Sequence, residues 1–270
     1  MKNRISVMSM PGVISLAALL LLWGPPATAA PEGANPPLQV LVVTAPDWSD
    51  FHADLEIYER KDPKSPWISA GERIPAVVGR KGLAWGRGVF AGTPDEGPQK
   101  REGDGKAPAG IFKLGFAFGY PPGESVPWVR LPYRQMTKSS RCVDDSASPF
   151  YNRLVDEGRT PKSWQSHEEM RRDDDQYSLG IVIEHNTEPV TPDGGSCIFL
   201  HIWAGPNQGT SGCTAVSAQA MEAILRKLKP EANPLLIQLP RKEYERLREQ
   251  GAPIAHHMET GELFPVLKSP

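Results

Sequence analysis

Two residues that together can perform nucleophilic chemistry lie twelve positions apart in this chain. Cys213 follows the glycine-containing segment Gly209–Gly212, and His201 is the one polar side chain in the apolar run Ile198–Ile202. A thiol on a tight loop beside an imidazole on a strand is the arrangement of enzymes that transfer acyl groups through cysteine. A single His or Cys is often an ordinary core residue. The pair therefore predicts Cys213 as the nucleophile and His201 as its base.

The loop that carries the cysteine also offers groups for binding. The backbone N–H groups of Gly212 and Cys213 are predicted to hold the oxyanion that forms when a thiolate attacks a carbonyl. Thr210 and Ser211, which come just before them, are predicted to contact the substrate. We expect this loop to open a helix over 218–228.

These residues resemble the signature of the YkuD-type L,D-transpeptidases, which cross-link peptidoglycan through a cysteine nucleophile. The resemblance spans about 38–239 and matches a branch that reads Thr-x-Gly-Cys-x-Ala. Ser211 and Ala215 stand where better-known members have His and Arg, so contacts made by those two side chains are not carried over. Further segments that resemble the family are Ala107–Phe112, Gly79–Gly86 and Cys142–Leu154.

The resemblance implies a mainly β fold, a YkuD-like β-sandwich with a few peripheral helices. It also implies a reaction without a cofactor. A peptidoglycan stem peptide of the meso-diaminopimelate type would form a thioester with Cys213, and an amine acceptor would then release the acyl group. Two alternatives stay open. One is an L,D-carboxypeptidase or endopeptidase with the same Cys/His site, and the other is a non-catalytic wall-binding module.

A zinc site is a rival explanation for the same part of the chain. His185, Cys197, His201 and Cys213 supply nitrogen and sulfur ligands within thirty residues. However, Cys197 and His201 are four apart on a predicted strand, which separates their Cα atoms by roughly 13 Å. Donor atoms on one zinc ion lie within about 4 Å of each other. We therefore predict no metal.

The N-terminus predicts export. Lys2 and Arg4 precede an apolar stretch, Val13–Trp23, and a small-x-small cleavage motif ends at Ala29. This stretch is too short to span a bilayer, which takes about 20 apolar residues. A cleaved signal peptide is therefore expected, with a periplasmic or otherwise extracytoplasmic product and no stable membrane span after cleavage. An uncleaved membrane anchor is the alternative.

Composition limits the possible partners. The chain has 30 basic and 32 acidic residues, a formal net charge of −2, and its basic pairs are scattered. Nucleic-acid binding needs a concentrated basic face, so we exclude nucleic acid as a partner. The 28 prolines and 25 glycines indicate a turn-rich, β-dominated domain. The 3 cysteines allow either a Cys142–Cys197 disulfide with Cys213 free, or three free thiols.

Hydrophobic patterns predict the elements and the domain organisation. The insert 134–176 is expected to wall a groove for an acceptor peptide. Strands are predicted at 38–43, 76–78, 110–118, 128–133, 180–185, 196–202 and 234–239, and helices at 218–228 (N-capped by Ser217) and 241–250. The domains are a signal peptide (1–29), a flexible lead-in (30–37), the catalytic domain (38–240) and a C-terminal helix and tail (241–270).

Overall fold

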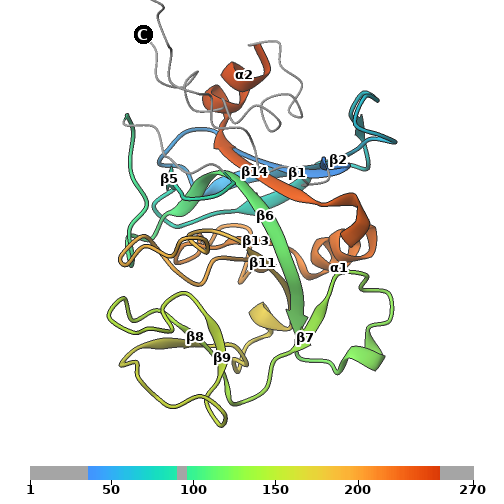
Figure 1. Ribbon diagram of the computed structural model, residues 1–270. Helices are drawn as coiled ribbons and strands as arrows, with labels where there is room; N and C mark the ends of the chain where they lie inside the picture. Colours follow the sequence, from blue (N-terminus) through green and yellow to red (C-terminus); the bar gives the residue numbers. More distant parts are fainter. Residues whose placement is uncertain (1–35, 90–95, 250–270) are drawn as a thin grey trace, which may run out of the picture.

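The computed structural model describes residues 36–89 and 96–249 (Figure 1). The predicted signal peptide, most of the lead-in and the tail from residue 250 lie outside the described residues. Among the residues that are described, no helix is both long and apolar enough to cross a membrane.

The main body is a sheet whose strand pairings close into a ring. The order is β1-β14-β6-β11-β12-β13-β4-β2, and β2 pairs again with β1. The ring strands are β1 (Gln39–Ala45), β2 (His52–Glu59), β4 (Ile74–Val77), β6 (Ala107–Gly119), β11 (Leu179–Ile183), β12 (Phe199–Ile202), β13 (Thr214–Val216) and β14 (Leu235–Pro240). Shorter strands at its margins are β3 (Ile68–Ser69), β5 (Leu83–Trp85) and β7 (Tyr133–Gln135).

Strand β6 connects the upper and lower parts of this sheet in Figure 1. It pairs with β14 on one side and with β11 on the other. Every residue of β1 and β14 is buried. Because side chains alternate between the two faces of a strand, both faces of β1 and β14 are covered, and helix α2 (Arg241–Glu249) contacts both strands. The predicted mainly β fold is confirmed, and its two layers are joined into one closed sheet.

The predicted insert 134–176 forms a second, smaller sheet at the bottom of Figure 1. Its order is β10-β8-β9. The bounds are Ser140–Val143 for β8, Leu154–Asp156 for β9 and His167–Glu169 for β10. A disulfide between Cys142 on β8 and Cys197 before β12 joins this small sheet to the main one. Of the two arrangements allowed by the cysteine count, the structure has one disulfide and a free Cys213.

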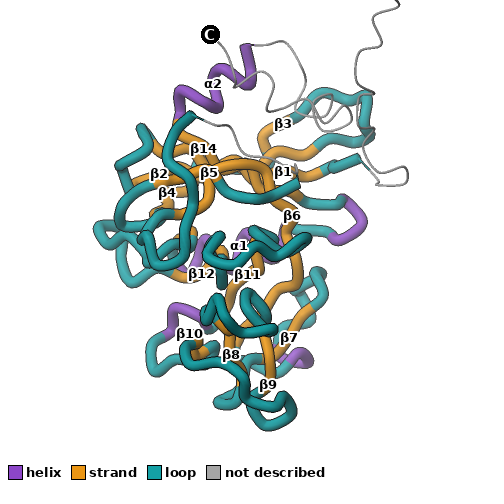
Figure 2. Tube along the Cα trace, turned by 60° about the vertical axis from the view of Figure 1, so that its left-hand side comes forward, coloured by secondary structure: helices purple, strands orange, loops and turns teal. Residues whose placement is uncertain are grey.

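Two α-helices occur in the described residues (Figure 2). Helix α1 (Ala218–Lys227) begins as predicted, because the Ser217 hydroxyl accepts a hydrogen bond from the Ala220 N–H at 3.1 Å. Its apolar stripe is buried, which confirms the predicted amphipathic helix. Helix α2 (Arg241–Glu249) is also confirmed. Short 3-10 helices are η1 (Gly123–Ser125), η2 (Asp175–Tyr177) and η3 (Pro230–Ala232).

Six of the seven predicted strands are present as β1, β4, β6, β11, β12 and β14, with shifted ends. The strand predicted at 128–133 is wrong. The chain turns there, with the Val129 N–H donating to the Val126 carbonyl at 2.9 Å, and of that segment only Tyr133 lies in a strand. Trp128 and Val129 lie in a loop and pack against the core. Apolar composition alone does not distinguish such a loop from a strand.

Candidate active site

Cys213 and His201 open onto one cavity of about 560 Å³. The pairing of β12 with β13 brings them there. These strands are parallel, with Leu200 opposite Thr214 and His201 opposite Ala215. Side chains alternate along a strand, so His201 and the residue just before β13 lie on the same face. The structure therefore brings together the two residues that the sequence singled out.

The Cys213 thiol is held by backbone groups of its neighbours. Its sulfur donates to the Cys197 carbonyl at 3.4 Å and accepts from the Phe199 N–H at 3.4 Å. Cys197 has a left-handed backbone (φ 55°), which few residues other than glycine adopt. Its N–H donates to the Asn152 side-chain oxygen at 2.9 Å. The disulfide and Asn152 thus fix the carbonyl that contacts the thiol.

Burial keeps this thiol protonated at rest. Desolvation, with the nearby Glu168 charge, raises the pKa of Cys213 to about 12, while the Phe199 N–H and the Tyr177 hydroxyl act in the opposite direction. The helix predicted after the cysteine loop begins at Ala218 as expected, but the short strand β13, which was not predicted, precedes it. Strand β13 separates Cys213 from α1, so the helix terminus is too far away to stabilise a thiolate.

The His201 imidazole is neutral at rest. Burial lowers its pKa to about 4, although the Ile202 and Gln176 carbonyls favour its charged form. Its Nδ1 lies 2.8 Å from the Ile202 carbonyl oxygen, which can only accept, so Nδ1 carries the proton and Nε2 is the basic nitrogen. Among the hydrogen bonds of the described residues, none joins His201 to Cys213.

The loop before Cys213 is fastened by its own side chains. Thr210 Oγ1 donates to the Cys213 carbonyl at 2.6 Å and accepts from the Gly212 N–H at 3.1 Å. The Gly212 N–H, predicted to hold an oxyanion, is therefore occupied. The Cys213 N–H has no hydrogen-bond partner in the described part of the chain. Ser211 Oγ accepts from the Arg80 guanidinium at 3.1 Å, which ties the loop to the turn before β5.

A family model described as the L,D-transpeptidase catalytic domain, YkuD, matches residues 66–237. The chain belongs to the YkuD family. The match covers more than half of the sequence and contains both Cys213 and His201. No curated protein and no solved structure matches the chain. Members of this family act on peptidoglycan peptides.

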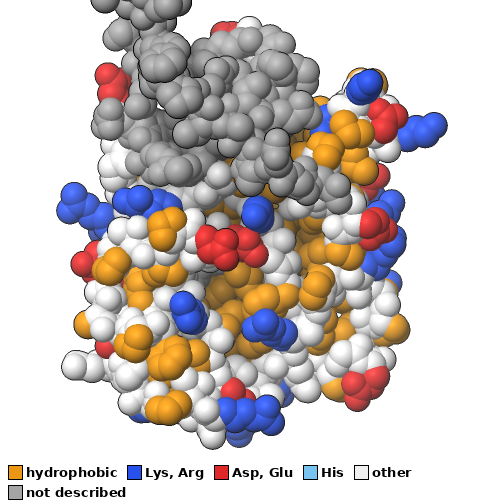
Figure 3. Space-filling model, in the orientation of Figure 1, with side chains coloured by type: hydrophobic (Ala, Val, Ile, Leu, Met, Phe, Trp, Pro, Cys, Tyr) orange, Lys and Arg blue, Asp and Glu red, His pale blue; other side chains and the backbone are white. Residues whose placement is uncertain are grey.

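The cavity of this YkuD domain is lined by charges of both signs that the sequence analysis did not identify. The charged lining residues are Arg80, Lys100, Glu102, Asp144, Glu168 and Arg172. They come from segments far apart in the chain, and no spacing pattern connects them. The face in Figure 3 likewise shows basic and acidic side chains interspersed, without one basic patch. A cavity with both charges is suited to a zwitterionic ligand.

Most of these charges already have partners. Lys100 Nζ lies 2.7 Å from Asp104 Oδ1, and Glu102 accepts from the Ser196 hydroxyl at 2.7 Å. Arg80 differs, because within the described ranges it forms no salt bridge and its side chain bonds only to the neutral Ser211. The Arg80 guanidinium, at the rim beside the loop that precedes Cys213, is therefore free to bind a carboxylate.

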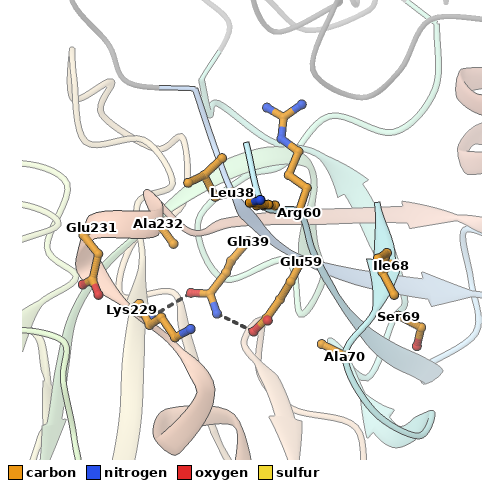
Figure 4. Close-up of a pocket in the computed structure, with 11 residues that line it drawn as sticks. Leu38, Gln39, Glu59, Arg60, Ile68, Ser69, Ala70, Lys229, Glu231 and Ala232 are labelled. Atoms are coloured by element: carbon orange, nitrogen blue, oxygen red, sulfur yellow. Dashed lines mark hydrogen bonds between the residues drawn. The ribbon is translucent and has the colours of Figure 1, made fainter. Parts of the chain in front are cut away.

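Another cavity of about 560 Å³ lies around β1, β2, β3 and η3 (Figure 4). Its central Gln39 donates to Glu59 at 2.7 Å and accepts from the Lys229 N–H at 2.8 Å, so these polar groups hold the fold together. No histidine or cysteine lines it. This cavity lacks the groups for nucleophilic chemistry.

The zinc alternative finds no support in the geometry. The Cys197 sulfur is bonded to Cys142. Both ring nitrogens of His185 are occupied, by the Arg87 N–H at 3.2 Å and the Gly194 carbonyl at 2.9 Å. The described residues contain no group of three or more side chains placed to hold a metal ion.

The raised pKa of Cys213 predicts a slow, steeply pH-dependent alkylation. A raised thiol pKa means that the reactive thiolate is scarce at neutral pH and increases well into the alkaline range. We expect native protein at neutral pH to react with iodoacetamide at least about tenfold more slowly than the same protein unfolded in guanidinium. Mass spectrometry after quenching measures the rate. A plateau reached below pH 8 in the native protein would show a resting thiolate instead.

Proposed function

We propose that this YkuD domain is an exported cysteine acyltransferase that forms a thioester with a peptidoglycan stem peptide and transfers it to an amine. The observation that carries the proposal is the shared cavity of His201, on β12, and Cys213, just before the neighbouring strand β13. A buried thiol and a neutral imidazole that line one cavity can act as a nucleophile and its base. Membership of the YkuD family supports the same chemistry.

Acylation begins when the peptide carbonyl enters the cavity. The Cys213 sulfur attacks the carbonyl carbon, and His201 Nε2 takes the thiol proton. The low pKa of His201, about 4, keeps Nε2 unprotonated at neutral pH. We assign stabilisation of the oxyanion to the Cys213 N–H, which has no hydrogen-bond partner among the described residues. The C–N bond then breaks, His201 returns its proton to the leaving amine, and the thioester remains.

The charges of the cavity suit a stem peptide, which carries both carboxylate and amino groups. We assign carboxylate contact to Arg80, the rim cation without a salt bridge in the described residues. Glu102 and Asp144 supply negative charge for an amine. This arrangement offers an alternative to the family's Arg, whose position is taken here by the fully buried Ala215.

Transfer rather than hydrolysis requires that an acceptor be held near the thioester. The small sheet supplies a wall for this purpose. Asp144 follows β8, Glu168 lies on β10, and Arg172 and Gln176 come from the next segment, and all four line the cavity. A hydrolase needs only water. The wall therefore favours the transferase over the carboxypeptidase or endopeptidase and over a wall-binding module.

Export is supported by two features. The first 29 residues have the pattern of a signal peptide. The Cys142–Cys197 disulfide is of a kind that persists in oxidising compartments. We expect cleavage after Ala29 and an extracytoplasmic product. N-terminal sequencing of protein from fractionated cells checks this, and recovery of the Met1 terminus in the membrane fraction would contradict it.

Substitution of the two central residues tests acylation. A carbapenem, which resembles the acyl donors of the family, should add its mass to Cys213, and Cys213→Ala should remain unmodified. His201→Ala should slow this acylation by about 10²–10⁴, the usual contribution of a general base. Time-resolved mass spectrometry gives the rates.

The matched control is His185→Ala. His185 is also buried on the neighbouring segment, but both of its ring nitrogens hold backbone groups. Its loss should lower the free energy of unfolding while the folded protein still acylates within a few-fold of the parent. A larger effect on acylation from His185→Ala than from His201→Ala would show that the base is misassigned.

Two soluble stem peptides distinguish transfer from hydrolysis. Incubation of a donor and an acceptor with the mature protein should give cross-linked dimers, because the walled cavity holds the acceptor against the thioester. The dimers should be absent with Cys213→Ala. Shortened monomers as the sole product at high acceptor concentration would identify a peptidase.

A further inference from the structure

Glu168 carries a carboxyl group that has no role in the proposed acylation step. It lies on β10 of the small sheet, half-buried, and its side chain lines the cavity that contains Cys213. Its two sequence neighbours do not line the cavity. The small sheet therefore presents one carboxyl group of β10 to the nucleophile.

Tyr177 connects this carboxyl group to the reaction centre. Its hydroxyl donates to Glu168 Oε2 at 2.7 Å. Tyr177 and Cys213 line the same cavity and belong to one packed cluster, and the Tyr177 hydroxyl lowers the pKa of the thiol. The Tyr177 ring packs edge-on against the His201 imidazole, with centroids 5.0 Å apart. Burial holds the pKa of Tyr177 well above its usual range, so the phenol keeps its proton. A hydroxyl with a proton and a free lone pair can pass a proton between two neighbours.

The surroundings make Glu168 a stronger base than His201. Enclosure raises the pKa of Glu168 to about 7, and the charges of Asp144 and Glu102 act in the same direction. The hydrogen bond from Tyr177 and the charge of Arg172 act against this rise. A group with a pKa near the working pH is the most effective proton acceptor and donor.

We propose that Glu168 is a second proton-transfer group of the site, which takes the proton of the acceptor amine and returns one to the Cys213 sulfur through the Tyr177 hydroxyl. The geometry that carries this is the hydrogen bond between Tyr177 and Glu168, together with the cavity that Glu168, Tyr177 and Cys213 all line. The inference rests on the proposed acyl transfer. It assigns a proton-transfer residue to the second half of that reaction, the release of the acyl group, for which the sequence indicated none.

Bonds and protons balance in the proposed release step. The nitrogen of a neutral amine forms a bond to the thioester carbonyl carbon, and one N–H proton goes to the Glu168 carboxylate. As the C–S bond breaks, the Tyr177 hydroxyl gives its proton to the departing sulfur and receives the proton held by Glu168. The products are an amide, the Cys213 thiol and the Glu168 carboxylate. No oxidant, reductant or further reactant is needed.

The test separates the two half-reactions in Glu168→Gln, which keeps the size of the side chain and removes the titrating group. Protein acylated by a donor stem peptide is mixed with an acceptor peptide, and loss of the thioester is followed by mass. Acylation should stay within about fivefold of the parent, while release should slow by about 10²-fold or more. The control is Glu169→Gln on the same strand, which is exposed and outside the cavity, and it should match the parent.

The dependence of the release rate on pH distinguishes a proton-transfer role of Glu168 from a purely structural role, which would not change this dependence. The carboxylate is the active form, so the parent-to-variant ratio of release rates should rise with pH and level off above about 7. The ionisation of the amine affects both proteins equally and cancels in this ratio. Tyr177→Phe, which keeps the ring packing on His201, should slow release in the same step.

Each outcome decides between the proposals. If the parent forms no thioester, the proposed acyltransferase and this inference both fall. If Glu168→Gln acylates normally and releases the acyl group within threefold of the parent at every pH, only the role of Glu168 is overturned. Slow release by Tyr177→Phe together with normal release by Glu168→Gln also overturns it, because the hydroxyl would then act alone.

Discussion

The parallel pairing of β12 with β13 determines the rest of the site. Parallel neighbours cannot be joined by a tight turn, so the chain must leave the sheet after Ile202 and return before Thr214. That return segment is pinned by Thr210, which bridges to Gly79 and receives the Arg80 N–H at 2.8 Å. Without this crossing, the thiol and the imidazole would not share a cavity.

Desolvation is the second constraint. It raises the pKa of Cys213 and lowers the pKa of His201. It disfavours the charged form of each, so the pair rests as thiol and neutral imidazole rather than as an ion pair. Such a site stores no reactive thiolate while it is empty. In the proposed reaction, proton transfer accompanies the arrival of the carbonyl, whose developing charge we assign to the Cys213 N–H. Reactivity is thereby linked to occupancy of the cavity.

Many of the elements with local signals were predicted, although the alternating strand β2 (His52–Glu59) was missed. The apolar runs of β1, β11 and β14 and the N-cap Ser217 of α1 lie where the patterns placed them. His201 and Cys213 were found because the residue types are rare and their context is distinctive. The short strand β13 was missed, since three residues do not show a period, and the false strand at 128–133 arose because a packed loop can be as apolar as a strand.

The other cavity residues could not be predicted in this way. Glu168, Tyr177 and Arg80 are polar residues in irregular or short elements, and their proximity depends on the disulfide and on long-range strand order. The occupied Gly212 N–H illustrates the same limit, because a threonine hydroxyl two residues away takes it. Side-chain competition for a backbone donor is decided by loop conformation, which the glycine spacing does not specify.

The disulfide of the small sheet has a consequence for how the three cysteines pair. Two of the three possible pairings among its cysteines would consume Cys213, and its sulfur hydrogen-bonds to the carbonyl of a disulfide-bonded residue. Thiol–disulfide exchange requires a thiolate, however, and burial withholds it. Once folded, the chain can thus keep an oxidised pair and a reduced sulfur side by side in one oxidising environment. The burial that shapes the site therefore also preserves the cysteine pairing of the folded chain.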